Sequence, residues 1–126
     1  MKEDVTYGKR ILLIEDDRAA RESTKLLLNI DRHTVTEAED GIAGLSLVAE
    51  QPFDLVVLDY FMPGIDGCEV ARRIKHMAPS MPILMTTAYL EKLVGFDKEP
   101  VNAVLAKPFA MDELRAEITK LLSAQH

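Results

Sequence analysis

The sequence predicts an α/β protein, a doubly wound five-stranded parallel sheet with helices on both faces. Short apolar runs alternate five times with segments whose apolar residues recur at helical spacing. The runs at 11–14 and 55–58 are apolar throughout, which is typical of strands buried on both faces. Acidic residues follow both of these runs directly. Alternation of this kind indicates parallel strands that are joined by right-handed helical crossovers.

The apolar content of the five predicted strands indicates their order in the sheet. The first and third, at 11–14 and 55–58, are the most apolar and should be central. The second, at 33–36, alternates with polar residues, and the fifth, at 103–106, is short, so both are placed at the edges. The fourth covers 83–87. This gives the flavodoxin-like order 2-1-3-4-5, whose topological switch point lies between strands one and three.

Helical periodicity predicts a helix after each of the first three strands and another after the fifth. These helices start near Arg18, cover 41–50, start near Cys68, and close the chain. The segment 89–102 is harder to interpret, because Gly95 and Pro100 would keep any helix there short. The residues predicted to face the sheet are Ser23, Leu26, Leu27 and Ile30, then Ile42, Leu45, Val48 and Ala49, then Val70, Ile74 and Met77, and finally Leu114, Ile118, Leu121 and Leu122.

Length and charge restrict the class of protein. With 126 residues the chain is long enough for one domain, and we expect a lead-in at 1–9 and a single domain at 10–126. The net charge of −6 and the lack of a basic stripe argue against a nucleic-acid binder. The single cysteine, Cys68, indicates a reducing compartment. Without an apolar run that could cross a membrane, we expect a cytoplasmic protein that has no membrane contact.

Three acidic residues should meet at the switch point of the sheet. Glu15 and Asp16 follow the first strand, and Asp59 ends the third. Two like charges ~4 Å apart cost about 4 kcal/mol at a protein surface, so either one carboxyl holds a proton or a cation binds. Because the available ligands are hard oxygens, Mg²⁺ is the expected cation. A carboxylate beside Mg²⁺ is suited to forming an acyl phosphate.

Donors for such a phosphate are predicted at the ends of the other strands. Thr87 closes the fourth strand with a hydroxyl, the Ala88 amide lies beside it, and Lys107 follows the fifth strand. An ammonium and fixed hydrogen-bond donors can neutralise the equatorial oxygens of a transferring phosphoryl group. By contrast, we interpret Asp17 as a solvated acid at a helix N-terminus or as a helix cap, Asp66 as a turn residue and Thr86 as strand packing.

Together these motifs resemble the signature of response-regulator receiver domains. The resemblance extends from about Arg10 to Leu122. Its motifs are Glu15-Asp16, Asp59 with Met62-Pro63-Gly64 and Asp66-Gly67 after it, Thr87-Ala88, and Lys107-Pro108-Phe109. The resemblance implies that Asp59 accepts a phosphoryl group from a histidine kinase or a histidine phosphotransfer protein and then switches an output partner. It also implies that catalysis is limited to the domain's own phosphorylation and dephosphorylation, and it leaves room for a dimer that forms on phosphorylation.

The resemblance also implies a role for each site residue. The phosphoryl group would be held by Thr87, the Ala88 amide and Lys107, and the Lys107–Pro108 bond would be cis. The Mg²⁺ ligands would be Asp16 and Asp59 through their side chains, Glu15 through water, and Phe61 through its backbone carbonyl.

Two features depart from the family pattern. Val104 occupies the place where an aromatic ring commonly relays the signal, so we expect the loop after Thr87 to reorder instead. The rings of Phe61 and Tyr89 lie two residues after Asp59 and Thr87, where they would limit the access of water and slow hydrolysis of the aspartyl phosphate.

Three other functions remain as alternatives. A phosphatase of the haloacid dehalogenase type would need a second acid where Phe61 stands. A flavin-binding module would need a glycine-rich phosphate loop where the first strand instead leads into acids. A degenerate receiver that only docks would not need the complete set of site residues.

Overall fold

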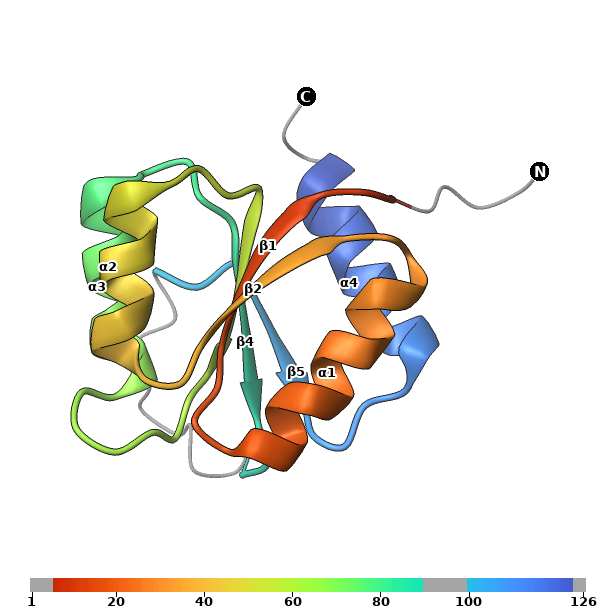
Figure 1. Ribbon diagram of the computed structural model, residues 1–126, viewed down its shortest axis with the longest axis horizontal. Coiled ribbons are helices and arrows are strands. Elements are labelled where there is room, and N and C mark those ends of the chain that lie inside the picture. The colour runs from red at the N-terminus through yellow and green to blue at the C-terminus, as the bar shows by residue number, and fades with distance from the viewer. Residues whose placement is uncertain (1–5, 90–99, 124–126) are drawn as a thin grey trace.

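The molecule is a three-layer sandwich in which helices cover both faces of one sheet (Figure 1). The computed structural model describes residues 6–89 and 100–123. Its elements are β1 (Arg10–Ile14), α1 (Arg18–Ile30), β2 (Thr34–Ala38), α2 (Gly41–Glu50), β3 (Leu55–Asp59), α3 (Gly67–Met77), β4 (Ile83–Thr87), β5 (Ala103–Ala106) and α4 (Met111–Ser123). None of the helices in the described part of the chain is long and apolar enough to cross a membrane.

The sheet confirms the predicted topology. Its order is β2-β1-β3-β4-β5, and every pair of neighbouring strands is parallel. All residues of β3 and β4 are buried, whereas the edge strands β2 and β5 are partly exposed. The carboxyl ends of all five strands therefore lie at one edge of the sheet, at the bottom of Figure 1.

The core consists of two apolar clusters, one on each face of the sheet. Leu12 and Ile14 of β1 pack with residues of α2 and α3, whereas Ile11 and Leu13 pack with residues of α1 and α4. This division follows from the alternation of side chains along a strand. Figure 1 shows the same arrangement, with α2 and α3 on the left of the sheet and α1 and α4 on its right.

The predicted helix faces are only partly confirmed. All four predicted residues of α4 are buried, and so are Val70 and Ile74 of α3. In α1 only Leu27 of the predicted apolar residues packs against the core. Leu26 and Ile30 are 66% and 59% exposed, and Thr24 and Leu28 are the buried residues instead. Apolar residues occupy positions 26, 27, 28 and 30, so the periodicity does not decide which face is buried.

Two further apolar residues lie on the outside against expectation. Ile42 of α2 is 57% exposed, and Met77 in the last turn of α3 is 45% exposed. In α2, Gly41 and Gly44 are the buried residues, and a Cβ atom on Gly44 would overlap the side chain of Ile14. The face of α2 toward the sheet therefore carries glycine because the helix approaches β1 closely.

Strand and helix limits agree closely with the prediction, with one shift. The second strand covers 34–38 rather than 33–36, and His33 lies just before it. The expected reordering of the loop after Thr87 concerns residues that lie outside the described ranges, apart from Ala88, Tyr89 and 100–102.

Candidate functional site

The three predicted acidic residues converge at the carboxyl edge of the sheet. Glu15 and Asp16 follow β1, Asp59 is the last residue of β3, and one carboxylate oxygen from each lies within 4.8 Å of the others. Glu15 and Asp59 are buried, at 3% and 6% exposed, while Asp16 is exposed. Because β1 and β3 are paired neighbours, residues far apart in the chain share one site. Three oxygen ligands in this arrangement fit a hard divalent cation such as Mg²⁺.

Lys107 lies between the two buried acids. Its Nζ is 2.6 Å from Glu15 Oε1 and 2.9 Å from Asp59 Oδ1. It follows β5 directly, its backbone N–H donates to the Thr87 carbonyl at 2.7 Å, and the Lys107–Pro108 peptide bond is cis as predicted. The ammonium of the last strand thus reaches back across the sheet to the first and third strands.

The pKa values of Asp59, Glu15 and Lys107 are shifted by two opposing effects, burial and the hydrogen bonds between them. Burial raises the pKa of Asp59 and of Glu15, and the hydrogen bond from Lys107 opposes the rise in both. For Lys107, burial alone would lower the pKa, but the bonds to the two carboxylates outweigh it and the pKa is raised. Two buried acids therefore share a single ammonium, which leaves an excess of negative charge that favours a cation.

Glu15 is held by several hydrogen bonds. Its Oε2 accepts from the Asp17 amide at 3.1 Å while its Oε1 accepts from Lys107. Asp17 caps α1, since its carboxylate accepts from the Ala20 amide at 2.8 Å, as predicted. Asp66 similarly caps α3 by accepting from the Glu69 amide at 3.0 Å, so its interpretation as a turn residue was incomplete.

The two threonines at the end of β4 have different hydrogen-bond partners. Thr87 is fully buried, and its Oγ1 accepts from the Tyr89 amide at 3.0 Å. Thr86, interpreted as strand packing, lies opposite Asp59 in the β3–β4 ladder, with Oγ1 3.5 Å from Asp59 Oδ1. Strand register brings this second hydroxyl to the site, and sequence spacing alone does not reveal it. Ala88 is exposed at the same edge.

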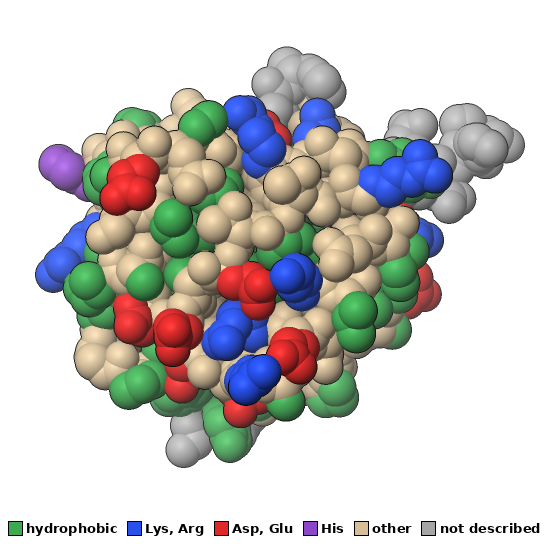
Figure 2. Space-filling view, viewed as in Figure 1, with side chains coloured by type: hydrophobic (Ala, Val, Ile, Leu, Met, Phe, Trp, Pro, Cys, Tyr) green, Lys and Arg blue, Asp and Glu red, His purple; other side chains and the backbone are tan. Residues whose placement is uncertain are grey.

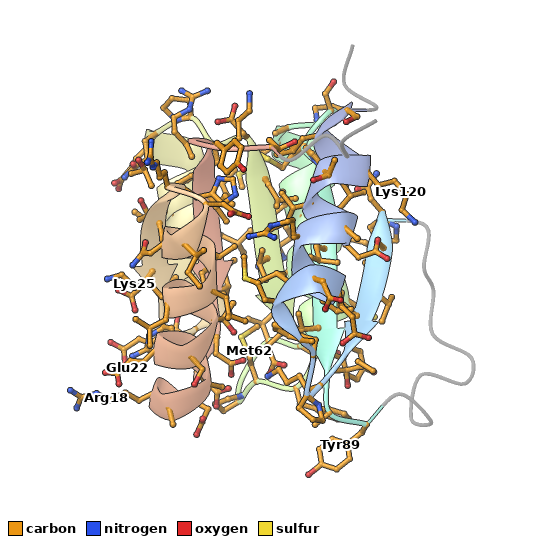
Figure 3. The ribbon with its side chains drawn as sticks, turned by 90° about the vertical axis from the view of Figure 1, so that its right-hand side faces the viewer. Arg18, Glu22, Lys25, Met62, Tyr89 and Lys120 are labelled. Atoms are coloured by element: carbon orange, nitrogen blue, oxygen red, sulfur yellow. The ribbon has the colours of Figure 1, made fainter. Side chains whose placement is uncertain are left out.

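Aromatic rings lie beside the site. The Phe61 and Tyr89 rings meet edge to face with centroids 5.5 Å apart, and the Tyr60 ring lies 4.6 Å from that of Phe61. Phe61 is 43% exposed and Tyr89 50% exposed. Figure 3 shows Tyr89 projecting outward at the edge where the strands end. The predicted pair of rings therefore exists and faces solvent.

The aromatic position of the family pattern is filled by a small side chain. Val104 of β5 is half-buried and packs against the cluster between the sheet and α2–α3. Sequence reasoning also missed Arg21, whose Nη1 donates to the Glu15 carbonyl at 2.8 Å. Arg21 lies in α1, six residues after Glu15, and nothing in the sequence pattern indicates that its side chain contacts the Glu15 carbonyl.

Comparisons with known proteins agree with this geometry. A family model described as the response regulator receiver domain matches residues 11–119. The response regulator MprA of Mycobacterium sp. (strain KMS) is 41% identical over 116 residues, which cover 90% of this chain and 50% of that protein. MprA of Mycobacterium leprae (strain TN) gives the same identity and coverage. The chain thus spans about half the length of the curated relatives it matches.

Solved structures show the same likeness. The response regulator TrrA of Thermotoga maritima, in complex with Mg²⁺-BeF, is 34% identical with a TM-score of 0.86, and the match covers 90% of this chain and 99% of that one. A CheY-like receiver domain protein of Methanospirillum hungatei JF-1 is 30% identical with a TM-score of 0.86, covering 94% and 96%. This chain belongs to the response regulator receiver domain family of two-component signalling.

Proposed function

We propose that Asp59 accepts a phosphoryl group from a phosphohistidine of a histidine kinase or a phosphotransfer protein. The observation that carries this proposal is the convergence of Glu15, Asp16 and Lys107 on the Asp59 carboxylate. In the transfer, an Asp59 carboxylate oxygen forms a bond to phosphorus while the bond from phosphorus to the donor nitrogen breaks. The electron pair of that bond stays on the imidazole nitrogen, so the products are an aspartyl phosphate and a free histidine.

The other site residues would bind the cation and hold the phosphoryl oxygens during the transfer. Mg²⁺, held by Asp16, Asp59, the Phe61 carbonyl and a water on Glu15, would neutralise charge on the transferring group. Lys107 supplies an ammonium that is within reach of Asp59 before transfer. The Thr87 hydroxyl and the Ala88 amide, both at the end of β4, would hold the phosphoryl oxygens. Because the Thr87 oxygen only accepts from the Tyr89 amide, its own proton remains available for donation to a phosphoryl oxygen.

The proposal extends to the bounds of the domain, its cation and its output partner. We infer that residues 10–126 form one receiver unit after a lead-in at 1–9, and that it catalyses only its own phosphorylation and dephosphorylation. The Mg²⁺-BeF complex of the Thermotoga maritima relative supports magnesium as the cation. Because the curated relatives are twice as long as the matched region, we propose that an output module or a separate output protein reads the phosphorylated state.

Phosphorylation can be tested by intact mass. The purified protein is incubated with acetyl phosphate and Mg²⁺, and we expect a mass increase of one phosphoryl group. Asp59→Asn should show no increase, because the amide cannot form an acyl phosphate. An unmodified wild-type protein, or equal modification of Asp59→Asn, would contradict the proposal. A second arm with a phosphorylated histidine phosphotransfer protein tests the natural class of donor.

A further inference from the structure

The carboxylate of Asp16 has no side-chain or backbone donor to orient it among the residues that the structure describes. Glu15 accepts a hydrogen bond at each carboxylate oxygen, and Asp59 accepts at Oδ1 from Lys107 and Thr86. Within residues 6–89 and 100–123, by contrast, no hydrogen bond to the Asp16 carboxylate is present, although this group is one of the three that converge. Its direction therefore depends on the backbone that carries it.

Arg21 holds that backbone. Its Nη1 donates to the Glu15 carbonyl oxygen at 2.8 Å, and its side chain is 16% exposed. That carbonyl belongs to the planar peptide group that joins Glu15 to Asp16, so a bond to the oxygen restrains the plane from which Asp16 Cα extends. On the other side of the same residue, the Glu15 amide donates to the Ala38 carbonyl at 3.0 Å, which attaches it to β2.

The Arg21 guanidinium is itself held by an ion pair with Glu37 of β2. Its Nε lies 3.3 Å from Glu37 Oε1 on β2, and Lys25 Nζ lies 2.9 Å from Glu37 Oε2. A planar guanidinium can donate in two fixed directions at once, which an ammonium cannot reproduce. Figure 2 shows acidic and basic side chains interspersed over this face of the molecule, where α1 and β2 lie in Figure 1.

We propose that Arg21 is a positioning residue that holds the Glu15–Asp16 peptide so that the Asp16 carboxylate is directed at the divalent cation. This inference rests on the proposed function, because it assumes that the acids bind Mg²⁺. It assigns Arg21 a role through the backbone and not as a ligand, since a guanidinium carries only donors.

Electrostatics and positioning predict opposite effects when Arg21 is replaced. A positive charge close to the acids repels Mg²⁺, so its removal should tighten binding by Coulomb's law alone. Loss of positioning should weaken binding instead, and groups that orient metal ligands typically change affinity by about 10–100-fold. For a restraint that acts through one carbonyl we expect roughly the lower end, about tenfold weaker binding.

The experiment measures the Mg²⁺ dissociation constant of the unphosphorylated protein from amide NMR shifts. We expect Arg21→Gln to bind about tenfold more weakly, and Arg21→Lys, which keeps the charge but loses the fork, to bind more weakly than wild type as well. The matched control is Arg18→Gln on the same helix, whose 83% exposed side chain pairs with Glu22 and projects outward (Figure 3). This control should bind Mg²⁺ as tightly as wild type or slightly more tightly.

A second measurement separates positioning from damage to the chemistry. With acetyl phosphate, the Mg²⁺ concentration for half-maximal phosphorylation should rise in Arg21→Gln, while the rate at saturating Mg²⁺ should stay close to that of wild type. Unchanged or tighter Mg²⁺ binding in both Arg21 variants would overturn the inference, and if Arg21→Gln does not fold, Arg21→Lys decides alone. A wild-type protein that binds no Mg²⁺ would refute the proposed function and this inference together.

Discussion

Asp59 is a buried carboxylate, and under the proposed function its reactivity depends on its two partners in the described part of the chain. Lys107 and Thr86 both contact Oδ1, at 2.9 Å and 3.5 Å. A carboxylate saturated with strong donors would be a weak nucleophile. Burial, and after it the charge of Asp16, raises the pKa of Asp59 and so keeps the carboxylate basic, although Lys107 opposes the rise. Under the proposed function, the one ammonium that Asp59 shares with Glu15 stabilises the acidic cluster while leaving Asp59 able to react with phosphorus.

At the residue scale, the two rings beside Asp59 should slow the loss of its phosphoryl group. Phe61 and Tyr89 meet edge to face two residues after Asp59 and Thr87, and we expect them to exclude hydrolytic water. We expect the double variant Phe61→Asn with Tyr89→Glu to lose radiolabelled phosphate about tenfold faster or more, which corresponds to roughly 1.4 kcal/mol of barrier. Label retained by the purified phosphoprotein over time gives the rate, and an unchanged rate would contradict the role of the rings.

Whether a site residue can be predicted from the sequence depends on whether strand order, strand register or side-chain reach brings it to the site. Glu15, Asp59 and Lys107 were predicted because each follows an apolar run, and parallel strands end at the same edge. Thr86 was missed because its contact depends on the register Asp59↔Thr86, which the order of the strands does not contain. Arg21 was missed because a long side chain reaches a backbone atom, and sequence spacing carries no information on that reach.

At the element scale, packing against the sheet decides which face of a helix is buried where the apolar periodicity does not. In α4 the apolar residues occupy a single stripe, and the predicted face is the buried one. In α1 and α2 several registers of the apolar residues are compatible with a helix, and in α2 the buried face is the one that approaches the sheet closely. That approach needs small residues such as Gly44, which a search for hydrophobic residues overlooks.

Gly67 allows α3 to begin directly against the end of β3. A Cβ atom there would lie 2.9 Å from the Asp59 carbonyl oxygen and 2.9 Å from Tyr60 Cα, both backbone atoms that cannot rotate away. We expect Gly67→Ala to lower the free energy of unfolding by about 1–3 kcal/mol and to slow phosphorylation, because the end of β3 must shift. Urea unfolding and intact mass measure the two effects.

The control for Gly67 is a glycine with open space beside it. Gly64 has a φ of +86°, and a Cβ atom there would meet no heavy atom of the described residues within 4 Å beyond its chain neighbours. Gly64→Ala therefore introduces backbone strain without a collision. It should cost stability while leaving the rate of phosphorylation near that of wild type. Equal slowing in both variants would show that the contact of Gly67 with Asp59 and Tyr60 is not what matters.

His33 joins the start of β2 to the segment before β1 and should make stability depend on pH. It is 5% exposed, and its Nδ1 accepts from the Lys9 amide at 3.0 Å. Burial lowers its pKa below the ordinary value of 6.5, although Asp31 opposes this. The unfolded chain therefore binds the proton first, so the stability contributed by neutral His33 is present above pH 6.5 and is lost as the pH falls below it.

The test of His33 compares two proteins at two pH values. Urea unfolding at about pH 7.5 and about pH 5.5, on either side of the unperturbed histidine pKa, should show a smaller loss for His33→Asn than for wild type. The Asn side chain can still accept from the Lys9 amide but does not gain a proton. Equal losses in both proteins would mean that other groups cause the pH dependence.

At the scale of the whole molecule, the site exists only when the chain is folded. Glu15 and Asp59 are brought together by the pairing of β1 with β3, and Lys107 reaches them from β5 at the far edge of the sheet. The two apolar clusters hold that sheet from opposite faces, so its strand ends have little freedom to separate. Concentrating like charges at one edge costs stability that the clusters must supply.

Mg²⁺ should therefore stabilise the whole fold and not only the site. An ion that binds the folded arrangement and not the unfolded chain adds about 2.7 kcal/mol to the free energy of unfolding at 100 times its dissociation constant. We expect urea unfolding to show this gain for wild type and a much smaller one for Asp16→Asn, which removes the negative charge of one of the three converging carboxylates. Sodium chloride at matched ionic strength controls for screening. If it stabilises wild type as much as Mg²⁺ does, the gain comes from general screening of a chain with a net charge of −6, and not from an ion bound at the strand ends.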